Sequence, residues 1–313
     1  MLYPDFEDLL HMGYRAGKLD VAARRPVLSI VSGDHVSPFR GRGLEFEEVR
    51  EYVHGDDVRN IDWRVTARTG RPHLKLFAEE RERSVLICTD LNPTMRFGTR
   101  GTFKSIQAAR AAALLGWSAS RDNNRIGGSF FGNVSGGMMF IDPARSRKSL
   151  WRMLKQLCDQ AEYSEERVAL EDHLRYLAKA TPSGALVFII SDFMVQRDDL
   201  KKQLSRLHRH ADVVLVAVND PADAFLPSAG ALIFTGRGDE KLTVNTADRK
   251  GAEGWARLWQ ENRSHLRNVA TALGLGLIEL STDRDVALDL ASGVRSLRRR
   301  GGFGHGRPAR TAS

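Results

Sequence analysis

Two short apolar runs of the sequence end in side chains that carry oxygen. The first run is followed by Asp90, Asn92 and Thr94, and the second by Asp192. Carboxylate, amide and hydroxyl oxygens are the ligands that a hard cation such as Mg²⁺ prefers. Acids at strand ends also accept hydrogen bonds from nearby backbone amides and cap the following helix. Two interpretations therefore stand for these residues: a degenerate divalent-cation site, or turn and cap residues with a local role.

A second cluster of charge occupies residues 55–63, which read Gly-Asp-Asp-Val-Arg-Asn-Ile-Asp-Trp. Together with one nearby arginine, its candidate residues are Asp56, Asp57, Arg59, Asp62, Trp63 and Arg68. Three interpretations stand: a catalytic acid cluster, a recognition surface, or a local network. In the network, one of the first two aspartates caps a short turn, an arginine pairs with Asp62 through its planar fork, and Trp63 packs beneath. The segment offers no nucleophile oriented by a base, so we favour the network.

From Ser84 onward, apolar runs of strand length alternate with helical patterns. Strands are expected over residues 84–89, 125–131, 137–141, 185–190, 212–218 and 276–280, with an edge hairpin over 232–234 and 242–244. Helices are expected over residues 102–120, 146–160, 170–180, 198–210, 249–273 and 283–297. Strands that are apolar on both faces and separated by helices predict an α/β fold with a doubly wound, mostly parallel sheet. Such sheets bind ligands outside the carboxyl ends of their strands, so we expect Asp90 and Asp192 to converge on one crevice.

The composition is that of a globular protein. Of 313 residues, 42% are hydrophobic and 27% are charged, which excludes whole-chain disorder. The two cysteines are too few for a disulfide scaffold and are expected to be reduced thiols of a cytosolic protein. No apolar run approaches the roughly 20 residues of a membrane span, and the first residues lack the features of a signal peptide. We therefore expect a cytoplasmic protein without a membrane span.

The net charge of +8 is concentrated near the end of the chain. Residues 293–313 hold six arginines and no acid, which leaves about +2 for the rest. A basic tail of this kind can touch nucleic acid nonspecifically, but a solvated, disordered terminus is the interpretation we favour. No specific nucleic-acid partner is expected, and removal of this tail is expected to leave the fold intact.

The segment around residues 55–63 resembles a known family. Its motifs are Gly41–Phe46, Arg50–Tyr52, Gly55–Trp63, Ala67–Arg68 and Phe77–Glu80. They resemble the bacterial and archaeal domain-of-unknown-function family 58 (DUF58), over roughly residues 32–290. The resemblance implies a domain similar to the von Willebrand factor type A fold. Members are often encoded beside MoxR-type AAA+ ATPases, which implies a role as a partner or adaptor of such an ATPase in the maturation of protein complexes.

The same resemblance implies a metal-ion-dependent adhesion site. Domains of this type hold a metal through Asp-x-Ser-x-Ser after the first strand, a distant Thr, and an Asp after the fourth strand. Asp90 matches the first acid and Asp192 the last, while Asn92 and Thr94 stand where the two serines would be. The distant Thr has no clear counterpart, with Ser164 as a candidate. Mg²⁺ or another divalent cation is the only cofactor that this implies.

We therefore expect three regions: residues 1–83, which carry the family signature and pack on the main domain; residues 84–292, the von Willebrand factor A-like or Rossmann-like domain; and residues 293–313, a basic disordered tail. The expected function is that of a noncatalytic protein-interaction adaptor whose partner is a MoxR-type AAA+ ATPase docked at the Asp90–Asp192 crevice. The alternative is a metal-dependent hydrolase or phosphotransferase that uses the same crevice.

Overall fold

The computed structural model describes residues 3–19, 27–29, 44–54, 56, 58, 61–79, 83–159, 168–194, 197–226, 230–235, 241–246 and 248–299. The chain divides into two compact units. One unit consists of Met1–Ala22 and Arg83–Ser313, and the other of Ala23–Glu82. Each unit is described by itself.

The larger unit is built on a six-stranded sheet with the order β11-β8-β7-β4-β5-β6. Its strands are β4 (Ser84–Leu91), β5 (Arg125–Gly132), β6 (Met138–Ala144), β7 (Leu186–Ser191), β8 (Asp212–Asn219) and β11 (Gly276–Ser281). All neighbouring strands run parallel except β6, which is antiparallel to β5 at the edge. Counted from β4 in chain order, this is the 3-2-1-4-5-6 order of doubly wound sheets. The predicted fold class, a mostly parallel α/β sheet of the von Willebrand factor A and Rossmann kind, is confirmed.

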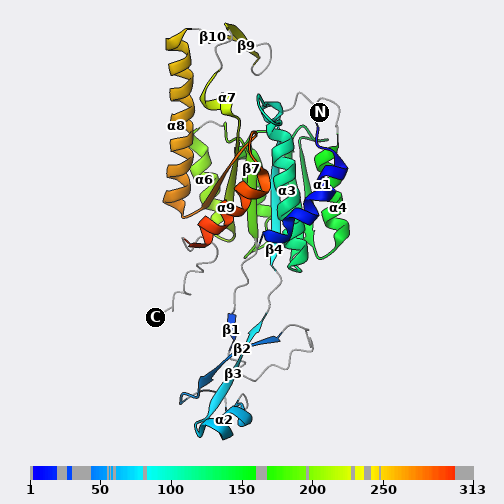
Figure 1. Ribbon diagram of the computed structural model, residues 1–313, viewed down its shortest axis with the longest axis vertical. Coiled ribbons are helices and arrows are strands. Elements are labelled where there is room, and N and C mark those ends of the chain that lie inside the picture. Colours follow the sequence, from blue (N-terminus) through cyan, green and yellow to red (C-terminus); the bar gives the residue numbers. More distant parts are fainter. Residues whose placement is uncertain are drawn as a thin grey trace. The chain divides into compact units, whose positions relative to one another are not determined.

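Helices cover both faces of this sheet, as Figure 1 shows. On one face lie α1 (Phe6–Arg15), α3 (Lys104–Arg121), α4 (Arg147–Cys158) and α9 (Val286–Arg299). On the other face lie α5 (Leu170–Ala180), α6 (Arg197–His208) and α8 (Arg249–Leu273). The central strands alternate between the two cores: Val85 and Ile87 face the first, and Leu86 and Cys88 the second. This is why they read as continuous apolar runs.

Short elements complete this unit. They are η1 (Ala16–Lys18), η3 (Pro93–Arg96), α7 (Pro221–Ala224), β9 (Ala231–Thr235) and β10 (Lys241–Asn245). Strands β9 and β10 form the predicted hairpin, but in a two-stranded sheet of their own and not at the edge of the main sheet. No helix in the described part of the chain is long and apolar enough to cross a membrane.

Helix α1 belongs to the larger unit, whereas the sequence led us to expect one N-terminal segment over residues 1–83. Leu9 and Met12 on α1 are buried in the core against α3. The Trp117 indole N–H donates to the carbonyl of Leu9 at 3.1 Å, and the Arg110 Nε lies 2.6 Å from Asp8 Oδ2. These contacts attach the first helix to α3 of the larger unit, so only Ala23–Glu82 separates as the second unit.

The predicted tail boundary at residue 293 is wrong, because α9 continues to Arg299. Val294 and Leu297 are buried in the core, and a Cβ added at Gly293 would lie 2.6 Å from Ile278 Cγ2. The arginines of this stretch occupy the exposed positions between the buried ones, as in an amphipathic helix, and the helix expected over residues 283–297 already overlapped the expected tail. Removal of residues 293–299 would therefore strip core side chains, contrary to the expectation; residues 300–313 lie outside the described residues.

The smaller unit contains a three-stranded antiparallel sheet with the order β1-β3-β2. Its elements are β1 (Val27–Ser29), β2 (Leu44–Glu51), α2 (Trp63–Thr69) and β3 (His73–Glu79). An isolated antiparallel bridge joins Ile61 to Leu74, and Leu74 is buried. Most of the family signature lies between β2 and β3. Both ends of this stretch therefore continue into strands of the same small sheet.

Candidate functional site at the carboxyl edge of the sheet

The structure places Asp90 and Asp192 at the same edge of the sheet. Strands β4 and β7 are parallel neighbours, with Val85 opposite Leu186 and Thr89 opposite Ile190. Asp90 is the next residue of β4, and Asp192 directly follows β7. Both are buried, with exposed fractions of 4% and 3%.

The Asp90 carboxylate is enclosed by hydrogen bonds from its own surroundings. Its Oδ1 accepts from the backbone N and the Nδ2 of Asn92, at 2.9 and 2.8 Å. Its Oδ2 accepts from Ser191 Oγ at 2.7 Å, and that hydroxyl oxygen accepts from the backbone N of Phe193 at 3.0 Å. A carboxylate that closes its own turn in this way is the strand-end role anticipated for such acids.

The pKa of Asp90 is raised to about 7, mainly by burial. The nearby Asp192 carboxylate contributes to this rise, because two like charges in a site of low polarity disfavour each other. The hydrogen bonds from Ser191 and Asn92 stabilise the ionised form and lower the pKa in part. Asp90 therefore changes its charge near neutral pH.

Asp192 faces a cation that sequence analysis did not identify. Its Oδ1 accepts from the backbone N of Met194 at 3.1 Å, while its Oδ2 lies 3.4 Å from Lys104 Nζ. The same ammonium group lies 3.0 Å from Asp223 Oδ1. Lys104 is only 3% exposed, and its ammonium lies 5.3 Å from the centre of the Phe97 ring. A buried lysine between two buried aspartates balances their charge from within.

One signal in the sequence could have indicated Lys104. It is the first residue of α3, where the helix dipole disfavours a positive charge. A lysine there indicates a compensating acid elsewhere in the fold. The acids that compensate it come from the ends of β7 and β8, far along the chain.

Arg263 adds a second buried cation from α8. It is 1% exposed, and its Nη2 donates to the backbone carbonyl of Asp192. Burial lowers the pKa of its guanidinium, whereas the charges of Asp192 and Asp223 raise it. The edge therefore combines two buried cations with the aspartates.

A further acid, Asp220, joins three loops at this edge. Its carboxylate accepts from the backbone N and Oγ1 of Thr99, the backbone N of Ala222 and the Oγ1 of Thr282. Burial raises its pKa, but these four donors outweigh burial and hold the pKa below its usual value. Asp223 completes a capping box by accepting from the backbone N of Asp220 at 2.8 Å. The loops after β4, β8 and β11 are thus held together by hydrogen bonds to one carboxylate.

The described residues do not fit a divalent cation in this arrangement. Asp192 is matched by an ammonium group, and Asn92 directs its Nδ2, not its carbonyl oxygen, toward Asp90. Thr94 is exposed on η3. Gly132, at φ 99°, packs so closely that a Cβ there would lie 2.8 Å from Asn92 Oδ1. No group of three His, Cys, Asp or Glu side chains able to hold a metal occurs among the described residues; Ser164 lies outside them.

In the smaller unit, the two described aspartates of the signature stabilise local backbone: Asp56 a turn and Asp62 the start of a helix. Asp56 forms a bidentate pair with Arg50 at 2.7 and 2.8 Å and accepts from the backbone N of Val53 at 2.9 Å. The hydrogen bond from Arg50 is the main cause that lowers the pKa of Asp56. Asp62 is the N-cap of α2 and accepts from the backbone N of Arg64 at 3.0 Å. The turn that Asp56 stabilises agrees with the network interpretation, although the arginine that pairs with Asp56 is one that it did not name. Asp62, which was expected to pair with an arginine, is a helix cap.

Trp63 contradicts the network interpretation, because it does not pack beneath the segment. Its side chain is 70% exposed on the first turn of α2. Two further large apolar residues of the same stretch, Val53 and Val58, are 61% and 57% exposed. Arg68 is exposed on the last turn of this helix. Asp57 and Arg59 lie outside the described residues.

Comparison with known proteins gives a family, relatives and similar folds. The sequence model of the family described as "Protein of unknown function DUF58" matches residues 48–265. Uncharacterized proteins of Mycobacterium bovis and Mycobacterium tuberculosis are 29% identical over 289 residues, which is 92% of this chain and 90% of theirs. Among solved structures, the conserved hypothetical protein BatB from Bacteroides thetaiotaomicron has a TM-score of 0.44 and 13% identity, over 69% of this chain and 99% of that one. The SpRpn10 VWA domain has a TM-score of 0.41 and 10% identity, over 73% and 100%.

Proposed function

Since the chain belongs to the DUF58 family, whose sequence model spans residues 48–265, we propose that it works as a noncatalytic protein-interaction adaptor. The observation that carries this proposal is the exposure of Trp63 within the signature segment. Tryptophan is enriched among the residues that dominate binding energy at protein interfaces. A tryptophan left 70% exposed on an ordered helix therefore marks a surface suited to a protein partner.

The helix that carries Trp63 is fixed at both ends. Asp62 caps its first turn, and Gly70 ends it in the left-handed conformation with φ 73°. Little conformational freedom of this helix remains to be lost when a partner binds, and such preorganisation favours affinity. The exposed Val53 and Val58 belong to the same stretch and enlarge the apolar surface that it offers.

The carboxyl edge of the main sheet supports an adaptor more than a catalyst. Ser191 Oγ donates to Asp90, a pairing that resembles a nucleophile and its base, but Ser191 is fully buried. The metal-dependent alternative needs a cation beside Asp192, where the Lys104 ammonium lies. Direct docking of a partner onto these carboxylates is equally disfavoured, because the exposed fractions of Asp90 and Asp192 are 4% and 3%.

The proposed partner is a MoxR-type AAA+ ATPase, and the proposed setting is the maturation of a protein complex in the cytoplasm. The family resemblance supplies this partner. Both cysteines are free, with Cys88 buried and Cys158 half-buried, which is compatible with a reducing compartment.

The proposal is tested by capture of the purified MoxR-type ATPase of the same host on the immobilised chain. Trp63→Ala should weaken this binding by at least about tenfold. Truncation of a tryptophan that dominates an interface typically costs about 2 kcal/mol or more of binding free energy. The matched control is Trp151→Ala, a 46% exposed tryptophan on α4, which should leave binding unchanged. Equal binding by wild type and Trp63→Ala would reject the Trp63 surface, and no binding by wild type would reject this partner.

A further inference from the structure

The opposite edge of the main sheet carries an open basic cavity of about 520 Å³. Its wall includes Arg121, Arg145 and Arg147, and no acid is present among the described residues that line it. The cavity lies where β5 begins and where the antiparallel β6 ends, so it sits at the amino edge of the parallel strands. The carboxyl-edge aspartates take no part in it.

The start of α4 adds positive potential to this cavity. Ser146 is its N-cap, and the two residues that follow are Arg147 and Lys148. The first turn contains no acid, as is also the case for α2, α3 and α8. Cations at a helix N-terminus oppose the helix dipole, so the dipole and these side chains both add positive potential beside the cavity. An anion bound here would offset both the dipole and the side-chain charges.

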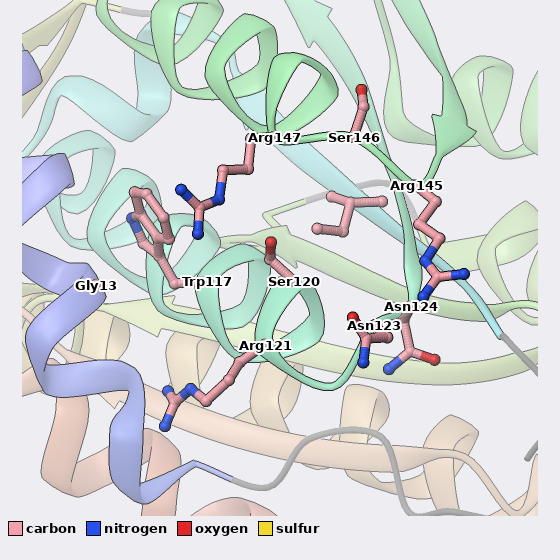
Figure 2. Close-up of a pocket in the computed structure, with 10 residues that line it drawn as sticks. Gly13, Trp117, Ser120, Arg121, Asn123, Asn124, Arg145, Ser146 and Arg147 are labelled. Carbon is pink, nitrogen blue, oxygen red and sulfur yellow. The ribbon is translucent and has the colours of Figure 1, made fainter. Parts of the chain in front are cut away.

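Figure 2 shows how the basic side chains surround the space. Arg147 reaches from the start of α4 toward Trp117, and Arg145 extends on the other side of the cavity beside Asn123 and Asn124. Ser120 lies between them, while Arg121 is directed away from the centre. Within the described part of the chain, Arg147 forms no ion pair.

The walls of the cavity are held rigidly. The Trp117 ring is fixed by its hydrogen bond to the Leu9 carbonyl, and a Cβ at Gly13 would lie 3.1 Å from it. Asn124 is 7% exposed, and its Oδ1 accepts from the backbone N of Arg83 at 3.1 Å. Asn123 has a φ of 55°, in the left-handed region that asparagine tolerates. A wall that is already fixed loses little conformational entropy when a ligand binds, which favours affinity.

We propose that this cavity binds an acidic peptide segment of a protein partner. A guanidinium group pairs with a carboxylate through two parallel hydrogen bonds. Since Arg145 and Arg147 lie on opposite sides of the space, they suit carboxylates spaced along a chain and do not converge on one phosphate. This proposal rests on the proposed function only in assuming that the ligand is part of a protein. The cavity does not include Trp63.

The test is fluorescence polarisation with a labelled octapeptide of alternating Glu and Ser, and with the same peptide in which Gln replaces Glu. The double variant Arg145→Glu, Arg147→Glu should weaken binding of the acidic peptide by at least about tenfold, since hydrogen bonds between charged groups are lost and repulsion replaces them. The matched control carries the same charge change at two exposed arginines outside the cavity, Arg209→Glu and Arg257→Glu. It should keep the affinity within about twofold.

Three results would overturn the proposal. They are unchanged binding in the cavity variant, an equal loss in the control, and tight binding of tripolyphosphate by a protein that does not bind the peptide. A milder pair, Arg145→Gln and Arg147→Gln, should also lose the peptide and shows that added repulsion is not the cause. Trp63→Ala should retain peptide binding, so failure of the ATPase-binding test with peptide binding intact would reject the proposed function alone.

Discussion

The two edges of the main sheet differ in whether their charged side chains are buried and paired within the protein or exposed beside a cavity. At the carboxyl edge, Asp90 and Asp192 are buried, and Lys104 supplies a counter-charge from within the fold. At the amino edge, Arg147 lies exposed beside an open cavity whose described lining residues include no acid. Buried charges must find partners inside the protein, so they tie its loops together. Charge that is left at the rim of a cavity remains available to a ligand.

The largest expected effect follows from removal of the internal cation. Lys104→Met would leave Asp192 and Asp223 buried without their shared partner, and the free energy of unfolding should fall by about 3–5 kcal/mol. Urea denaturation at pH 7.5 measures this change. The control Lys148→Met, at an exposed position on α4, should change stability by less than about 0.5 kcal/mol. Similar stability of both variants would show that the carboxyl edge does not depend on its internal charge pairing.

A second prediction concerns the pH dependence that Asp90 gives to stability. Its folded pKa of about 7 lies above the value near 3.9 of an unfolded aspartate. Between these values the folded state holds a proton that the unfolded state has released, so stability falls as pH rises from about 4 to 7 and then levels off.

The Asp90→Asn variant should lack this slope, because asparagine does not titrate. Urea denaturation at several pH values between 4 and 8 measures it for both proteins. Asp220 has a lowered pKa, so its contribution has the opposite sign: it is present above the unfolded pKa and is lost as pH falls through the folded pKa. Asp220→Asn should thus leave the slope between pH 4 and 7 in place. An identical slope in wild type and Asp90→Asn would contradict the raised pKa.

The smallest expected effect belongs to the amino edge. Arg147→Glu replaces a cation in the first turn of α4 with an acid, which the helix dipole favours, and should raise the free energy of unfolding by about 0.3–1 kcal/mol. Thermal and urea denaturation at low salt detect such a gain. A stability loss above about 1 kcal/mol would instead mean that the Arg147 side chain stabilises the fold and is not free to bind a ligand.

The sequence by itself determined the larger architecture. Apolar runs alternating with helices predicted the parallel sheet, and the parallel arrangement of β4 and β7 was enough to bring Asp90 and Asp192 to one edge. It also indicated that Asp56 or Asp57 stabilises a short turn, and Asp56 does accept from the backbone N of Val53 within such a turn. These features depend on residues within a few positions of one another, or on the fixed geometry of a sheet, and both leave a periodic trace in the sequence.

Only the tertiary structure decided which charges are paired. Lys104 meets Asp192 and Asp223 across separations of 88 and 119 residues. The basic cavity gathers Gly13, residues 117–126 and residues 145–147. The exposure of Trp63 and the burial of Val294 and Leu297 were likewise set by which surfaces pack together. Charge pairing and burial are properties of the assembled fold, because a side chain's partner is whatever packing brings near it, and no local period in the sequence records that choice.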